Sequence, residues 1–187
     1  PFDEAYASER RMMEPLIEIF QHKGDSECSP GSTHSDELCG FEKMPFTNLA
    51  QANLLQPNPG GVPATDFIRD AYGAGLQFGE DLGVNPFEHG IIAASDTHLG
   101  TPGAVMEEDF TGHGGAGTDN STSLPVGLPD NPYFNPGGHA VVWADENSRE
   151  SLFTAMRRRE TYGTSGPRMI LRFFGGYGYD ANLCESP

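Results

Sequence analysis

A short run of small and branched apolar residues at 91–94 is followed at once by Ser-Asp-Thr-His at 95–98. The run predicts a buried strand, because strands inside parallel sheets are apolar on both faces. Residues i and i+2 of an extended segment point to the same side, so Asp96 and His98 can reach one metal ion together. Ligands bind at the carboxyl ends of such strands. The pattern predicts a metal site; the alternative is a strand end at which Asp96 bonds loop amides and His98 is exposed.

Strands and helices are predicted to alternate along the chain, which is typical of an α/β fold. The expected helices cover 3–13, 65–82 and 148–160, and the expected strands cover 16–20, 90–95, 140–143 and 169–174. Thr65 and Asn147 are the predicted N-caps of the second and third helices, and Gly83 is the predicted end of the second. Leu76 is expected on the apolar face of that second helix.

The 187 residues are expected to form one domain or a large piece of one. A segment rich in Gly, Pro, Asn and Ser at 99–138 is expected to be a long loop within it. A loop of this length is usually an active-site cover or disordered.

The formal net charge of -16 makes nucleic acid and anionic membranes poor partners. No apolar stretch approaches the roughly 20 residues of a membrane span. Six of the eleven basic residues nevertheless lie between 149 and 172. This local basic patch would suit a small anionic substrate, although the arginines at 157–159 would also complement the dipole at a helix end.

Three cysteines, Cys28, Cys39 and Cys184, contain no Cys-x-x-Cys spacing, so a thiolate zinc site is not expected. Cys28 and Cys39 bracket a flexible turn, and a disulfide between them would close a short loop. Such a bridge implies an oxidising compartment and a periplasmic or secreted protein. The alternative is a cytosolic protein with two free thiols.

Several segments resemble a bacterial family known only as domain of unknown function 3604. They are residues 16–28, 82–87, 95–98, 143–153, 157–168 and 173–176. That family is similar to the polymerase and histidinol phosphatase (PHP) superfamily of metal-dependent phosphoesterases. The resemblance implies a distorted β/α barrel with two or three metals bound by His, Asp and Glu.

One family feature, a His-x-His pair after the first strand, is missing from this sequence, which begins with Pro rather than Met. We therefore expect residues 1–187 to be the C-terminal part of a PHP-like catalytic domain. The family's metal ligands carry over only onto Asp96 and His98. The remaining ligands would come from the missing N-terminal half or from another chain that packs against this one. Ligands of this type suit zinc, manganese or iron.

The function expected from these patterns is a metal-dependent hydrolase of phosphate esters or similar small anionic esters. Glu18 and Glu27 are expected to assist catalysis, and Glu18 is also placed to orient a ligand histidine. Lys23 is a candidate phosphate contact, with a solvated loop lysine as the alternative. Arg157 and Arg168 are the expected substrate-binding residues.

Two alternatives stay open. Residues 161–166 resemble a phosphate-binding loop, but they follow a helix end, which favours a plain helix-to-strand turn. His139 and the other loop histidines are expected to be structural or exposed. The rival function is a non-catalytic binding or scaffold domain that keeps the fold.

Overall fold

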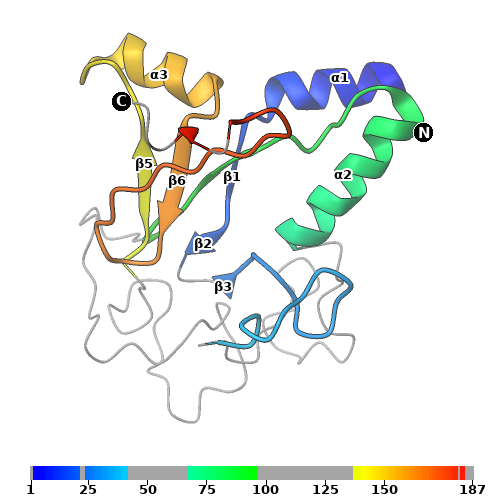
Figure 1. Ribbon diagram of the computed structural model, residues 1–187, viewed down its shortest axis with the longest axis horizontal. Coiled ribbons are helices and arrows are strands. Elements are labelled where there is room, and N and C mark those ends of the chain that lie inside the picture. The colour runs from blue at the N-terminus through cyan, green and yellow to red at the C-terminus, as the bar shows by residue number, and fades with distance from the viewer. Residues whose placement is uncertain (1, 22–23, 42–66, 97–136, 181, 184–187) are drawn as a thin grey trace, which may run out of the picture.

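The computed structural model describes residues 2–21, 24–41, 67–96, 137–180 and 182–183. Within them the chain forms α1 (Glu4–Met13), β1 (Leu16–Glu18), β2 (Phe20–Gln21), β3 (Gly24–Asp25), α2 (Ile68–Leu82), β4 (Gly90–Ile92), β5 (His139–Val142), α3 (Arg149–Arg157) and β6 (Thr161–Thr164). The expected mixture of helices and strands is confirmed. Figure 1 shows α3 beside β5 and α2 beyond β1, with the strands between them.

The strands pair in three short ladders. β1 pairs with β4 in parallel, with Leu16 opposite Gly90. β2 and β3 form a small antiparallel pair, and β5 runs antiparallel to β6 with His139 opposite Thr164. The strands of the described residues do not close into a barrel.

Glycines bring β4 against β6, although no ladder joins these two strands. A Cβ added to Gly163 would lie 2.8 Å from the Cβ of Ala93, and one added to Gly90 would lie 2.9 Å from Thr161 Oγ1. The two contacts follow the same order along both strands, so β4 and β6 run in the same direction. The ends of β1, β4 and β6 therefore share one side of the strand layer, which we call the carboxyl edge.

Helix ends follow local chemistry in part. Asp3 caps α1 by accepting a hydrogen bond from the Tyr6 amide at 2.9 Å. Gly83 ends α2 in the left-handed conformation at φ 77°, as predicted. The prediction of Thr65 as the α2 N-cap is wrong, because Phe67 occupies that position without a side-chain cap.

The N-cap of α3 is Ser148 rather than the predicted Asn147, and its Oγ accepts a hydrogen bond from the Ser151 amide. Leu76 is 70% exposed rather than part of the apolar face of α2. Gly75 is buried on that helix instead, against the side chain of Asn85.

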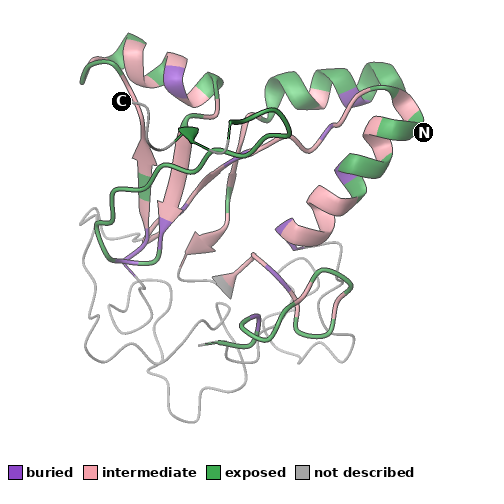
Figure 2. Ribbon diagram, viewed as in Figure 1, coloured by how far each residue is buried: buried purple, intermediate pink, exposed green. Residues whose placement is uncertain are grey.

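The strand predictions need three corrections. The strand expected at 16–20 is divided into β1 and β2, and β4 ends at Ile92 rather than at residue 95. The strand expected at 169–174 is not formed, and β6 lies instead where the sequence favours a turn or a phosphate loop. The reason is pairing: β6 forms a ladder with β5, whereas residues 169–174 are tied to that ladder only through side chains. Figure 2 shows this later segment as a continuous exposed stretch.

Among the described residues, the buried core is made mostly of short side chains. Ala7 of α1, Ala93 after β4 and Ala155 of α3 are buried, together with Phe67 and Ile68 at the start of α2. In the described part of the chain, no helix is both long and apolar enough to cross a membrane. The predicted loop at 99–138 lies outside the described residues except for its last two positions.

Candidate functional site

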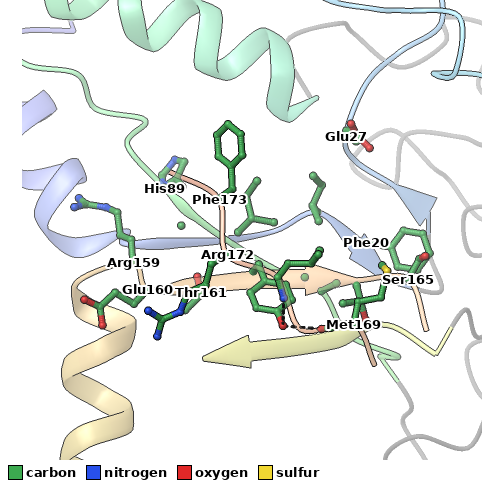
Figure 3. A pocket seen from close by; sticks show the side chains of 18 of the residues that line it. Phe20, Glu27, His89, Arg159, Glu160, Thr161, Ser165, Met169, Arg172 and Phe173 are labelled. Carbon is green, nitrogen blue, oxygen red and sulfur yellow. Dashed lines mark hydrogen bonds between the residues drawn. The ribbon is translucent and has the colours of Figure 1, made fainter. Parts of the chain in front are cut away.

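A cavity of about 1510 Å³ opens against the strand layer. Its walls come from β4, β6, the loop that follows β3, α2 and the segment 169–174. Figure 3 shows Phe173 reaching from that segment toward α2, with Ser165 and Phe20 at the far end. Ligand pockets commonly measure about 300–1,000 Å³, so this cavity has room for a small organic molecule.

The wall opposite the strands is fastened by a disulfide. Cys28 and Cys39 are bonded, with Cα atoms 5.8 Å apart, which is the pairing that the sequence predicts. Both cysteines are buried and line the cavity. The loop between them is also held on α2, where His34 Nδ1 lies 2.8 Å from Asp70 Oδ1. That hydrogen bond lowers the pKa of the Asp70 carboxyl.

An ion cluster joins this loop to α2 beside the cavity. Arg69 donates to Asp36 Oδ2 at 2.6 Å and, through Nε and an Nη atom, to Glu27 Oε1 at 3.0 and 2.5 Å. The two carboxylates raise the pKa of Arg69, and the Arg69 guanidinium lowers the pKa of Asp36. Glu27 therefore lines the cavity as the partner of an arginine.

Acid is expected to weaken the ion pair between Asp36 and Arg69. The folded-state pKa of Asp36 lies below its ordinary value of 3.8, so its contribution to stability is complete above that pH. The contribution is lost as the pH falls through the folded-state pKa. We expect Asp36→Asn to lower the urea midpoint at pH 7 and the difference from wild type to shrink toward zero at pH 3. Equilibrium urea unfolding at both pH values measures this, with exposed Glu37→Gln as the control. An undiminished difference at pH 3 would contradict it.

A second set of side-chain contacts holds the segment 169–174 against the β5–β6 ladder. Tyr162 donates from its hydroxyl to the Met169 carbonyl at 2.7 Å and accepts from the Leu171 amide at 3.3 Å. The indole of Trp143 donates to the Leu171 carbonyl at 3.1 Å. The guanidinium of Arg172 then lies over the Trp143 ring, 4.1 Å from its centroid.

The predicted metal ligand Asp96 lies four residues beyond β4, past the carboxyl edge. Its φ is 55°, a left-handed conformation, so the extended path assumed for Asp96 and His98 is interrupted at Asp96. His98 lies outside the described residues, as does Lys23. Glu18 is exposed at the last position of β1, and the cavity lining does not include it.

The structure places the two predicted substrate-binding arginines away from the cavity lining. Arg157 donates to the Met12 carbonyl at 2.7 Å, and Arg168 is exposed. Arg158, Arg159 and Arg172 of the same basic stretch line the cavity instead. The count of arginines along the sequence signals the patch, but which of them reach the cavity depends on how the chain turns after α3.

His139, which the sequence places among the structural or exposed loop histidines, also lies at the carboxyl edge. His139 begins β5 opposite Thr164, and the preceding Gly138 packs directly on the Ala94 carbonyl. Asp96 is only two residues beyond Ala94. A histidine that opens a strand carries no distinctive signal in the sequence, because the neighbouring strand that makes its position meaningful is distant in the chain.

Carboxylate and imidazole donors are of the type that binds zinc, manganese or iron. Within the described ranges no three such side chains converge on a point that could hold a metal ion. A site that uses Asp96 therefore needs donors from outside those ranges.

Comparison with known protein families finds that the chain matches the family described as "Protein of unknown function (DUF3604)" over residues 1–187. No curated protein and no solved structure matches the chain.

Proposed function

We propose, on the premise that this chain belongs to the DUF3604 family, that it is a metal-dependent hydrolase of phosphate esters or similar small anionic esters. One observation carries the proposal. The carboxyl edge, where β1, β4 and β6 end, adjoins a cavity of about 1510 Å³ that is lined by both Ala93 and Thr164. Asp96 follows Ala93 by three residues, and ligands in α/β folds bind at such edges.

Asp96 and His98 are the proposed metal ligands, and zinc, manganese or iron are the proposed metals. When bound, such an ion would acidify a water molecule and polarise the ester. The other donors are proposed to come from a PHP-like N-terminal half or another chain. The bridge between Cys28 and Cys39 supports a periplasmic or secreted location.

The chain's own contribution is to bind and orient the ester. Arg172, which lines the cavity, is the cation that we assign to the substrate's charge in preference to Arg157 and Arg168. Glu27 acts through Arg69, which it holds in place on the cavity wall. Glu18 and Lys23 remain proposed assisting groups.

The non-catalytic binding domain is the second candidate. The ion pair between Glu27 and Arg69 favours it, because this contact gives Glu27 a structural role in the cavity wall.

The test uses the full-length protein loaded with manganese or zinc. Metal content and the hydrolysis of 4-nitrophenyl phosphate are measured for wild type, for Asp96→Asn and for the exposed control Glu80→Gln. Loss of a ligand is expected to reduce metal affinity and hydrolysis by about tenfold or more, whereas the control keeps both. Metal binding that Asp96→Asn leaves intact would remove Asp96 from the site, and tight binding of the ester without turnover would favour the binding domain.

A further inference from the structure

A second cavity lies where the C-terminal ends of α1 and α3 face each other (Figure 1). Its volume is about 350 Å³, which is enough for a small ligand. Three of the residues that line it are arginines, namely Arg11, Arg157 and Arg159. The described lining contains no aspartate or glutamate, although the chain carries 27 acidic residues against 11 basic ones. This second cavity is therefore a basic site on an acidic protein.

Two of these arginines contact the last turn of α1. Arg157 donates to the Met12 carbonyl at 2.7 Å, and Arg159 donates to the Arg11 carbonyl at 3.4 Å. Figure 3 shows the Arg159 side chain extending toward α1. Arg11 and Met12 are consecutive in the helix, so their carbonyls are neighbours. The two guanidinium groups are therefore held close to each other at one end of α1.

Neither of these two guanidinium groups has a carboxylate partner in the part of the chain that the structure describes. A guanidinium carries five N–H donors, and one recorded hydrogen bond to a carbonyl leaves most of them available. The Nε of Arg159 is buried without an acceptor, at a cost in free energy that an incoming acceptor would recover. Glu160 does not supply the missing charge, because Arg158 holds it at 2.7 Å.

Helix ends alone do not balance the charge of this cavity. The C-terminal end of a helix carries about half a negative charge, so α1 and α3 together supply about one. Glu88 supplies another through its ion pair with Arg11 at 2.6 Å, whereas Glu14 is balanced by Arg10. Three guanidinium charges stand against these two, so about one positive charge remains. The helix ends weaken the attraction for an anion but do not cancel it.

We propose that the second cavity binds a doubly charged tetrahedral oxyanion, a phosphate or sulfate group, held by Arg157 and Arg159. Each planar guanidinium can donate two parallel hydrogen bonds to the oxygens of such a group. A carboxylate offers only two oxygens and one charge, so it satisfies two guanidinium groups less well. The site is independent of the proposed function, because it uses no metal ion and none of the residues assigned to ester hydrolysis.

Calorimetry on the full-length protein tests the ligand class. Inorganic phosphate, glycerol phosphate and acetate are titrated in the presence of a chelator, so that no metal-held anion contributes. Both phosphates are expected to bind about tenfold or more tightly than acetate. The tighter of the two shows whether the ligand is a free anion or the phosphate group of a larger molecule. Acetate binding as tightly as phosphate, or no phosphate binding at all, would overturn the proposal.

Variants locate the anion. Arg157→Gln and Arg159→Gln are each expected to weaken phosphate binding about tenfold or more through the loss of charge-assisted hydrogen bonds. Arg168→Gln is the matched control, because Arg168 is exposed, belongs to the same basic stretch and lines neither cavity. Arg172 lines the first cavity and not the second, so Arg172→Gln should also keep wild-type affinity. Binding that Arg172→Gln removes and Arg157→Gln leaves intact would place the anion in the first cavity and reject this site.

A purely structural role for these arginines predicts a different result. If Arg157 only caps α1, Arg157→Gln lowers the urea midpoint by the same amount with and without phosphate. The proposed site requires phosphate to raise the midpoint of wild type and of Arg168→Gln but to raise that of Arg157→Gln much less, because a ligand of the folded state stabilises it. Arg157→Lys keeps the charge and a donor for Met12 but loses the planar fork, so its affinity should lie between those of wild type and Arg157→Gln. An equal response of wild type and Arg157→Gln to phosphate would overturn the proposal.

Discussion

Replacement of Gly163 by alanine is expected to lower the free energy of unfolding by about 3 kcal/mol, which is large for the addition of one methyl group. The new Cβ would lie 2.8 Å from both the Cβ and the backbone nitrogen of Ala93. Ala93 is buried, and backbone atoms line the contact. Neither strand can therefore shift to make room for the methyl group without a large cost in free energy. The substitution would push β6 away from β4 and widen the carboxyl edge at the cavity.

Urea unfolding monitored by circular dichroism gives the change in the free energy of unfolding. The matched control is Gly178→Ala, because a Cβ at that position would meet no atom within 4 Å. A midpoint for Gly163→Ala equal to that of the control would show that the close approach of β4 and β6 does not exist in solution.

Removal of the disulfide by the double substitution Cys28→Ala and Cys39→Ala is expected to cost a similar amount, about 3 kcal/mol. The bridge spans eleven positions, and in the chain-entropy account a loop of this length contributes about that much by restricting the unfolded chain. The same loop carries His34 and Asp36, whose contacts hold it on α2. Without the bridge, only the contacts of His34 and Asp36 with α2 would hold this loop in place, and each such exposed contact contributes little to stability.

The change is measured by urea unfolding with and without a thiol reductant. Wild type should be destabilised by the reductant and the double variant should not respond. Cys184→Ala serves as the control, because it removes a cysteine and leaves the bridge in place. If reduction left the wild-type midpoint unchanged, the bridge would contribute nothing to the stability of the fold.

Local chemistry made several features predictable. Asp3 and Gly83 end their helices through groups within one turn, so the sequence alone indicates where α1 begins and α2 stops. The closeness of Cys28 and Cys39 in the chain limits how far apart they can lie, which made their pairing a sound prediction. The alternation of apolar segments with helices likewise indicated an α/β fold.

Pairing between distant segments had to come from the tertiary structure. The sequence favours a turn at 161–166 and a strand at 169–174, but β5 pairs with residues 161–164 and not with the later segment. That choice leaves Phe173 and Phe174 exposed and sets Arg172 over Trp143.

The backbone conformation at Asp96 could not be predicted from the sequence either. The motif at 95–98 indicates an extended strand end, but Asp96 adopts a left-handed conformation that ends the extended path. Sequence patterns report the preferences of a residue and its near neighbours, and these indicated the start of α1, the end of α2 and the disulfide. Strand partners, close glycine contacts and the position of Arg172 over Trp143 depend on contacts between residues far apart in the chain, whose free energies no local pattern records.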